Sequence, residues 1–350
     1  MRVRLAACAS ALTAAVAATG VTASAATGPP PPKTFGGATA TLYATGLKNP
    51  TSFAWGDGTM FAGDSGSSRK VPNGGVDIIA HGTATMVPHG PLFVGGMAWR
   101  HEALYLSDAY LTSRGPSFRI ERWSHFTGTD FTTRQVLYTA PKGFQAFNGI
   151  AFAPNGRLLV GVDLGLLNGN DHGPASTSPY LYDILSMRAN GRDVKVFASG
   201  IRQPWQMAFA RDSRAPFVSD LGQDGPKKVA KAGPPDFLLK AHRGQNYGFP
   251  RCNHTRFGSC RGFARPFKMF PPHSDIMGLA VIGRTLYMGS FLGEQGKGGA
   301  LYKMSIHGGR VTPVVTGFPA ATDALAAHGG KLYVGGSAPR IGGLIYQVTP

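Results

Sequence analysis

The sequence predicts an all-β protein, a six-bladed β-propeller, from three observations. A unit of two short apolar strands joined by a tight turn occurs six times, with its first-strand alanine at Ala54, Ala98, Ala151, Ala208, Ala280 and Ala326. The copies are spaced irregularly, by about 44 to 72 residues, which suits propeller blades better than solenoid turns. The 49 Gly and 26 Pro suit many turns and few long helices. A β-sandwich also has short strands, but six equivalent hairpins with matched chain ends favour the propeller.

The clearest copy is residues 151–163, which read A-F-A-P-N-G-R-L-L-V-G-V-D. The Asn-Gly pair supplies the positive φ angles that a tight turn between twisted strands requires. Further apolar strands follow most hairpins, which gives the four strands of a blade. Residues 39–47 and 344–348 are strands without hairpin partners at the two ends. We expect the N-terminal strand to complete the last blade and close the ring, so that residues 39–350 form one domain.

The N-terminus is typical of a targeting segment. Arg2 and Arg4 precede an apolar, Ala-rich run that ends in an A-S-A cleavage site, which predicts a signal peptide over residues 1–25. Residues 26–38 form a Pro/Gly-rich linker. No later apolar run is long enough to cross a bilayer, so we expect a secreted, extracytoplasmic protein without stable membrane insertion. The formal net charge of +17 is spread through the chain, and no clustered basic face of a nucleic-acid-binding module is present.

Two cysteines remain once the signal peptide, which contains Cys8, is removed. Cys252 and Cys260 flank a turn-rich segment, and an even pair in an exported protein favours a local disulfide. The alternative is a metal site, which would need more thiols or imidazoles than His254 alone supplies.

Three motifs occur in order in the second half of the chain: G-I-R-Q-P-W-Q-M-A-F (200–209), Q-D-G-P (223–226) and G-Q-N-Y-G-F-P (244–250). Their order and approximate spacing resemble those of the soluble quinoprotein glucose/sorbosone dehydrogenases. The resemblance implies a six-bladed propeller that binds pyrroloquinoline quinone and calcium. It also implies oxidation of a small-molecule carbohydrate or aldose by hydride transfer to the quinone.

The same resemblance assigns residues to the cofactor and to the metal. Arg202 falls on the arginine beside the quinone, Gln203 replaces its neighbouring asparagine, and Lys297 offers a cation to a quinone carboxylate. The main-chain carbonyls of Gly225 and Pro226 fall on calcium ligands, and hard oxygen ligands suit that ion.

The chain also departs from the family pattern. Gln145 stands where the catalytic histidine is expected, and an amide cannot accept a proton at neutral pH. The paired arginines of the family fall near Ala320 and Thr322. His273 precedes the fifth hairpin, where a role in capping the turn is the default interpretation; the alternative is a substitute base. Trp205 is the best candidate for a ligand wall.

Aspartates recur at defined positions of the repeat. Four of them end the second strand of a hairpin: Asp64, Asp108, Asp163 and Asp220. We expect these four to make structural hydrogen bonds from blade to blade. Asp275 and Asp323 instead lead into the fifth and sixth hairpins, where they either face the axis or cap turns.

Two functions from different classes therefore remain open. The first is an exported quinoprotein dehydrogenase of a sugar or aldose. The alternative is a catalytically impaired secreted propeller that binds a carbohydrate, a cell-wall fragment or a protein. The family likeness favours the first, and Gln145 with the missing arginines favours the second. The sequence does not indicate an oligomeric state.

Overall fold

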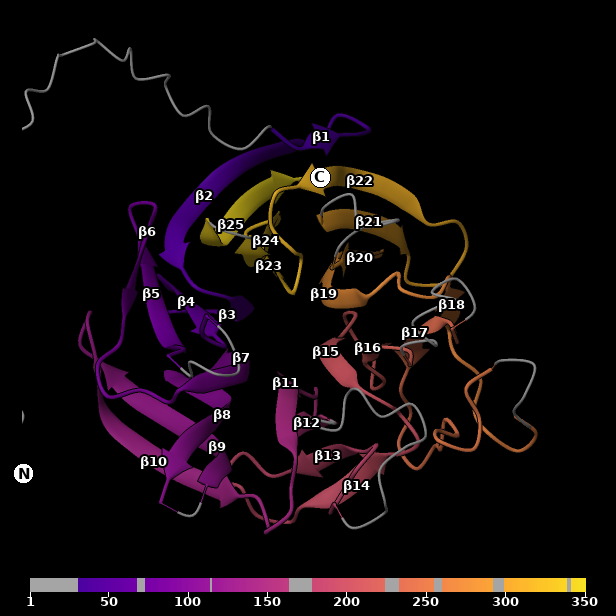
Figure 1. The fold of residues 1–350 in the computed structure, drawn as a ribbon, viewed down its shortest axis with the longest axis horizontal. Helices are drawn as coiled ribbons and strands as arrows, with labels where there is room; N and C mark the ends of the chain where they lie inside the picture. The colour runs from indigo at the N-terminus through magenta and orange to yellow at the C-terminus, as the bar shows by residue number, and fades with distance from the viewer. Residues whose placement is uncertain are drawn as a thin grey trace, which may run out of the picture. The chain divides into compact units, whose positions relative to one another are not determined.

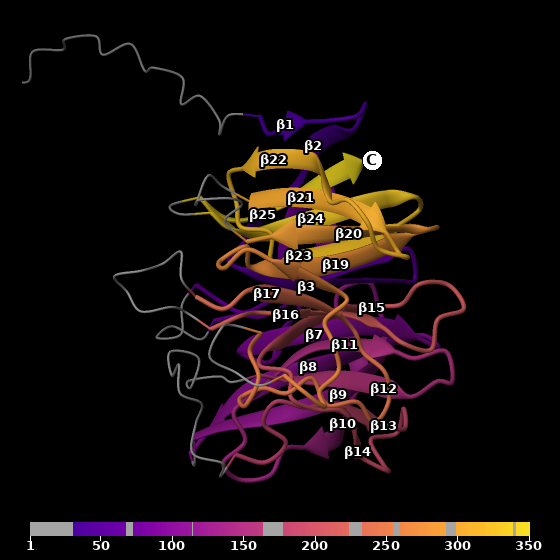
Figure 2. The same cartoon turned by 90° about the vertical axis from the view of Figure 1, so that its right-hand side faces the viewer.

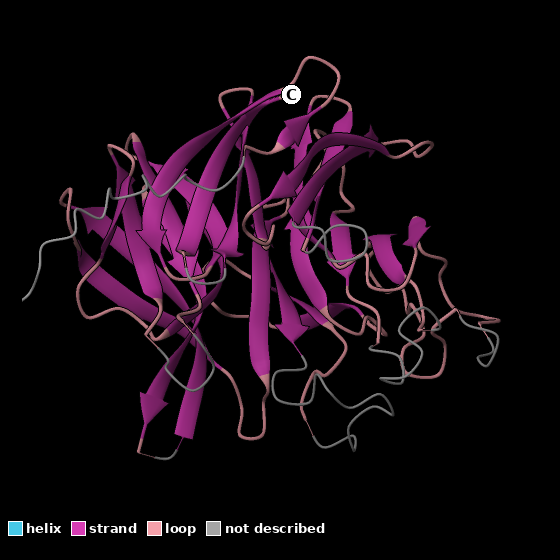
Figure 3. Cartoon of the chain, turned by 45° about the horizontal axis from the view of Figure 1, so that its top comes forward, coloured by secondary structure: helices cyan, strands magenta, loops and turns pink. Residues whose placement is uncertain are grey.

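The computed structural model describes residues 31–67, 73–113, 115–163, 178–223, 233–254, 260–291, 299–338 and 341–350. Residues Pro31–Pro350 form one compact unit. The expected signal peptide, residues 1–25, lies outside the described residues. The described part consists of strands and loops (Figure 3), and no helix in it is long and apolar enough to cross a membrane.

Each of the first three hairpins continues into a four-stranded antiparallel group. The first group contains β3 (Pro50–Gly56), β4 (Thr59–Asp64), β5 (Gly75–Ala80) and β6 (Thr83–Met86). The second contains β7 (Phe93–Arg100), β8 (Ala103–Thr112), β9 (Gly115–Phe126) and β10 (Phe131–Thr139). The third contains β11 (Ala146–Phe152), β12 (Leu158–Asp163), β13 (Ile184–Met187) and β14 (Lys195–Ala198).

The next two hairpins build two further antiparallel groups. The fourth contains β15 (Pro204–Ala208), β16 (Phe217–Asp220), β17 (Asp236–Lys240) and β18 (Lys268–Phe270). The fifth contains β19 (Ile276–Ile282), β20 (Thr285–Ser290), β21 (Gly299–Ser305) and β22 (Thr312–Phe318), with β1 (Lys33–Thr34) on its outer edge. The pairing of β1 with β22 shows that part of the expected linker is ordered against the sheet.

The last hairpin pairs with segments from both ends of the chain. It consists of β23 (Ala324–His328) and β24 (Lys331–Ala338), followed by β25 (Gly342–Thr349). The strand β2 (Thr39–Leu47) lies antiparallel to β25, with Thr39 opposite Thr349. One parallel pair, Thr45 with Thr83, also links β2 to β6 of the first group.

All six predicted hairpins are confirmed as antiparallel pairs. In the Asn155–Gly156 turn only Gly156 has positive φ, of 81°, so the expectation is wrong for Asn155. Both turn residues have positive φ at Asp57–Gly58 and at Gly329–Gly330. The second hairpin reaches the same geometry without glycine, because His101 and Glu102 have φ of 46° and 54°. Non-glycine residues rarely adopt this conformation, so the flanking strands must hold this turn in place.

The first strands of the six hairpins form a closed cycle of contacts. β3 contacts β7, and the contacts continue through β11, β15, β19 and β23 back to β3. These strands lie innermost among the described strands in Figure 1, and Figure 2 shows the same strands from the side. Apolar clusters fill the spaces between neighbouring groups; one of them contains Phe61, Trp123 and Phe131.

Glycine permits close contact between first strands near the axis. A Cβ on Gly96 would lie 2.6 Å from the Cα of Gly149. A Cβ on Gly149 would collide with the carbonyl oxygen of Trp205. A side chain at either position would push neighbouring strands apart, so both positions require glycine.

The aspartates at the ends of second strands do not all behave as expected. The Asp64 carboxylate accepts hydrogen bonds from the amides of Lys48 (2.7 Å), Asn49 (3.0 Å) and Gly66 (2.7 Å). Asp220 accepts a bond from the amide of Gln203 at 2.7 Å. These bonds lie within one hairpin group, so the predicted blade-to-blade role is wrong for both residues.

Hydroxyl groups make the links between neighbouring groups instead. The Thr51 hydroxyl donates to the carbonyl of Val94 at 2.6 Å, and Ser219 donates to Met277 at 2.7 Å. Ser107 donates to Asn148 at 2.6 Å in the same way. Each buried hydroxyl thereby satisfies a backbone carbonyl of the next group.

Candidate functional site

A polar network connects the fourth, fifth and sixth groups at the end of the ring where the first strands begin. Arg202 Nη1 donates to the carbonyl oxygen of Gly222 at 2.7 Å. The Gly222 amide donates to Asp236 Oδ1 at 2.6 Å, and the amide of Asp275 donates to Asp236 Oδ2 at 2.7 Å. Asp323 is coupled to this network by charge, because burial and then the charge of Asp275 raise its pKa. Arg202, Asp275 and Asp323 come from the loops before β15, β19 and β23. Gly222 follows β16, and Asp236 is the first residue of β17.

The third sequence motif supports the backbone that carries Arg202. The amide of Phe249 donates to the carbonyl oxygen of Gly200 at 3.0 Å, and the amide of Tyr247 donates to Ser199 at 2.9 Å. Gly200 has φ of +68°, and a Cβ there would collide with Asn246 Oδ1. The G-I-R-Q and G-Q-N-Y-G-F-P motifs therefore form one packed unit.

Asp323 is a buried acid with unused hydrogen-bonding capacity. Its side chain is 3% exposed, and Oδ1 has no hydrogen-bond partner among the described residues. Burial, with a smaller contribution from Asp275, raises the pKa of Asp323 to about 8. Its carboxyl group is therefore mainly protonated near pH 7 and able to donate a hydrogen bond. The half-buried Trp205 lies beside the backbone of this residue, because Trp205 Nε1 donates to the main-chain carbonyl oxygen of Asp323 at 3.1 Å.

Gln206 spans the axis next to this site. Its Nε2 donates to the carbonyl oxygen of Thr51 at 3.0 Å, and its Oε1 accepts from the amide of Leu279 at 2.9 Å. The bond to Thr51 joins β15 to β3. These two strands are opposite each other in the cycle of six first strands. A cavity of about 240 Å³ lies along the axis, with residues of all six first strands in its lining. Most of these residues belong to the middle or later part of their strands.

The structure places the residues predicted for the site in three classes. Arg202, Gln203 and His273 belong to the polar network, and the charge of His273 slightly lowers the pKa of Asp236, which burial raises. Trp205 lies beside Asp323 at the edge of this network. Gln145 precedes β11, and its Nε2 donates to the carbonyl oxygen of Gly143 at 3.2 Å.

The predicted calcium ligands, Gly225 and Pro226, and the predicted quinone contact Lys297 lie outside the described residues. Cys252 and Cys260 are joined by a disulfide. In the described part of the chain, the single group of three converging metal-ligand side chains consists of these two cysteines and His254.

The described residues do not fit a quinone that carries several carboxylates. Arg202 is 3% exposed, and its Nη1 already donates to the carbonyl oxygens of Leu221 and Gly222. Ala320 and Thr322, near the expected paired arginines, are also buried, and the Thr322 hydroxyl donates to Ser290. Because Arg202 Nη1 already donates to main-chain carbonyls, the described network offers a polyanionic ligand little positive charge to pair with.

The network includes residues that the sequence did not identify. Asp236 is not among the predicted site residues, yet its carboxylate connects the fourth and fifth groups. Gln206 lies within the first motif, but its partner Thr51 is 155 residues away in the sequence. The dipeptide Ser-Asp marks two of the hydroxyl links, at 107–108 and 219–220, but it also occurs at 274–275, where Ser274 donates to Pro271 within its own loop.

Comparison with known proteins shows the fold. No protein-family model and no curated protein matches the sequence. A glucose dehydrogenase-like oxidoreductase of Thermus thermophilus has a similar structure, with a TM-score of 0.69 and 19% identity over 89% of this chain and 100% of that chain. The PQQ domain of pyranose dehydrogenase from Coprinopsis cinerea gives a TM-score of 0.63 and 13% identity over 92% of this chain and 99% of that one.

A gluconolactonase from Xanthomonas campestris is also similar, with a TM-score of 0.59 and 14% identity over 91% of this chain and 94% of that one. The chain is thus a β-propeller structurally related to sugar dehydrogenases and lactonases. At these identities the likeness establishes the fold and does not resolve the family.

Proposed function

We propose that this protein is an exported six-bladed propeller that binds a neutral sugar or sugar lactone beside Trp205, without a quinone. In this proposal β2 completes the last blade, as its antiparallel pairing with β25 supports. The observation that carries the function is the position of Asp323 against Trp205. An indole offers an apolar surface to the C–H face of a sugar ring, and a protonated carboxyl group donates to a hydroxyl or carbonyl oxygen.

The charge distribution defines the preferred ligand class. Asp323 contributes a protonated carboxyl group, whereas Arg202, the nearby guanidinium, is buried and bonded to backbone carbonyls. A neutral ligand needs no cation to pair with, whereas the charge of a sugar acid or sugar phosphate would lose its hydration without gaining one. The structural likeness to sugar dehydrogenases and a gluconolactonase supports a carbohydrate ligand.

Quinone-dependent oxidation of an aldose, with calcium, is the competing proposal. It is supported by the motif at 200–209 and by the structural likeness to a PQQ domain. Its predicted calcium ligands and Lys297 are not among the described residues. Gln145 and the buried Ala320 and Thr322 argue against it.

A binding experiment tests the first proposal. Purified mature protein is titrated calorimetrically with a panel of neutral aldoses and aldonolactones, and with the matching aldonates. We expect a neutral compound to bind and its aldonate to bind at least about tenfold more weakly, a difference of about 1.4 kcal/mol. Trp205→Phe should weaken binding by a similar factor. Trp55→Phe is the matched control. Trp55 is also half-buried, but it lies near the end of β3, where it stacks on His328, whereas Trp205 lies near the start of β15.

Reconstitution separates the two proposals. The protein is incubated with calcium and pyrroloquinoline quinone, and the bound-quinone spectrum and dye reduction with aldoses are recorded. We expect neither signal. Quinone uptake with aldose-dependent dye reduction would replace the binding proposal with the dehydrogenase. Equal sugar affinity of the wild type and Trp205→Phe would contradict the proposed position of the ligand.

A further inference from the structure

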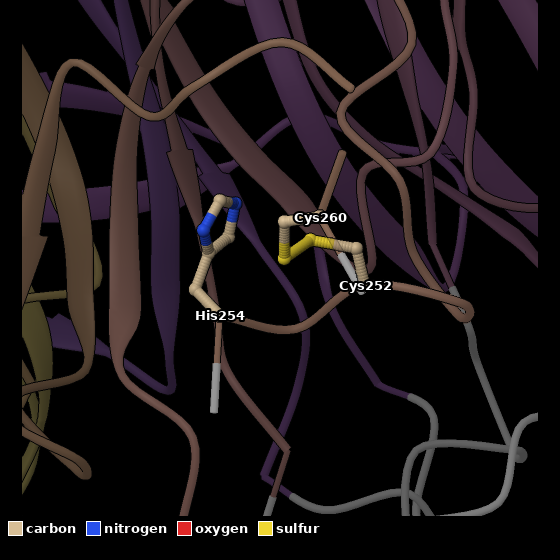
Figure 4. A group of neighbouring side chains, drawn as sticks. All are labelled: Cys252, His254 and Cys260. Carbon is tan, nitrogen blue, oxygen red and sulfur yellow. A yellow bond between two sulfur atoms is a disulfide. The ribbon is translucent and has the colours of Figure 1, made fainter. Parts of the chain in front are cut away.

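Three potential metal-ligating side chains converge in the loop between β17 and β18. The sulfur atoms of Cys252 and Cys260 and a ring nitrogen of His254 all lie within 4.8 Å of one another. Figure 4 shows the imidazole beside the two sulfur atoms, which are joined in the disulfide. The spacing of the cysteines predicts only the bridge, whereas the fold also brings the imidazole to it.

The imidazole of His254 has an unused nitrogen. Its Nε2 is inaccessible to solvent and has no hydrogen-bond partner among the described residues. The ring packs edge-on against Phe237, with centroids 5.2 Å apart, and the backbone of His254 has φ of +55°. A buried polar atom without a partner costs about 1 to 3 kcal/mol, so the arrangement calls for a ligand or another explanation.

The loop has anchors other than the disulfide. The amide of Cys252 donates to the carbonyl oxygen of Gly248 at 2.9 Å, and Asn253 Nδ2 donates to Gln223 Oε1 at 2.8 Å. Cys252 itself is 2% exposed. These contacts do not involve the sulfur atoms, so they anchor the segment before His254 independently of the sulfur–sulfur bond.

We propose that reduction of the Cys252–Cys260 disulfide by a dithiol creates a site for one zinc or copper(I) ion on two thiolates and the His254 imidazole. The dithiol supplies two electrons and two protons, its own sulfurs become a disulfide, and the protein bond opens to two thiols. The metal ion then displaces both thiol protons. Thiolate and imidazole ligands suit these ions, and three protein ligands leave a fourth zinc position open. The oxidised protein lacks the site.

Metal titration of the full chain tests this proposal. The protein is reduced under anaerobic conditions, the reductant is removed, and cobalt(II) is added while thiolate-to-cobalt absorption is recorded; zinc affinity follows by chelator competition. We expect one ion per reduced chain and none in the oxidised protein or in Cys252→Ser/Cys260→Ser. His254→Ala should weaken zinc binding at least about tenfold, since even loss of an outer-shell partner has an effect of that size.

His242→Ala is the matched control, because His242 is an exposed histidine close to the same loop; its zinc affinity should equal that of the wild type. Thermal unfolding of the reduced protein provides an independent measurement, because an ion that binds only the folded state raises the unfolding temperature. The proposal is overturned if reduced wild type binds zinc no more tightly than the double serine variant or than His254→Ala. It is equally overturned if zinc leaves the unfolding temperature of the reduced protein unchanged.

Discussion

Asp64 and Asp323 are both buried aspartates close to the start of a first strand, yet their carboxyl groups have different surroundings. Asp64 is fully buried and accepts three backbone amide bonds from its own hairpin group. Asp323 has an Oδ1 atom without a partner among the described residues, and burial raises its pKa to about 8. The first residue closes a loop, whereas the second keeps capacity for a ligand.

The difference follows from the position of each residue in its hairpin. Asp64 ends a second strand, where the amides before the first strand converge on it. Asp323 precedes a first strand, and its carbonyl oxygen accepts the bond from Trp205. Burial and residue type alone therefore do not separate a structural acid from a candidate functional one. For these two residues, the difference lies in the backbone amides that reach the carboxylate of Asp64.

The largest effect is expected for Asp64→Ala. Removal of three charge-assisted bonds leaves amide donors unsatisfied in the first hairpin group, which should reduce the free energy of unfolding by about 3 to 5 kcal/mol. Urea unfolding measures the loss. Asp64→Asn retains one acceptor oxygen and should lose less. If Asp64→Ala were as stable as the wild type, Asp64 would not have the structural role that distinguishes it from Asp323.

Gln206→Leu should have the next largest effect. The substitution removes the bonds to the Thr51 carbonyl and the Leu279 amide, and two buried backbone groups are left without partners. We expect a loss of about 2 to 4 kcal/mol in the free energy of unfolding, measured with urea. Gln206→Glu retains an acceptor for Leu279 and tests the two bonds separately. A loss below about 0.5 kcal/mol would show that the contact across the axis does not contribute.

The local features of this chain were predictable, and the contacts across the axis were not. The Asn155–Gly156 turn and the alternating strands indicate hairpins because turn geometry depends on neighbouring residues. Gln206 bonds to Thr51, and Asp236 connects two groups through loops that meet only when the ring is formed. Neither contact is indicated by a regular spacing of residues in the sequence. Likewise, the cysteine spacing indicated the bridge, but the approach of His254 depends on the path of the loop.

Asp323→Asn should change the pH dependence of stability. Because the pKa of Asp323 is raised in the folded state, the folded protein holds its proton while the unfolded chain releases it above about pH 4. Wild-type stability therefore falls as pH rises toward 8, by at most about 1.4 kcal/mol per pH unit from this group. Asparagine removes that contribution. Urea unfolding at pH 5, 6, 7 and 8 checks it.

The comparison of variant with wild type is necessary here. Burial also raises the pKa of Asp77, Asp183 and Asp220 to about 7 each, and these groups change wild-type stability in the same direction. Only the difference between the two profiles reports on Asp323. Parallel profiles would mean that Asp323 is ionised in the folded protein, and it would then no longer contrast with Asp64 as a protonated donor.

The smallest effect is expected for Gln145→Ala. Its side-chain amide makes one hydrogen bond, to Gly143 two residues away, at a partly exposed position. We therefore expect a change below about 0.5 kcal/mol in the free energy of unfolding, and unchanged sugar affinity. Gln145→His places the expected catalytic base at this position and tests whether its absence prevents oxidation. If quinone and calcium then produced dye reduction in this variant alone, the missing base would be the defect, and the site beside Trp205 would be a dehydrogenase site that has lost one residue.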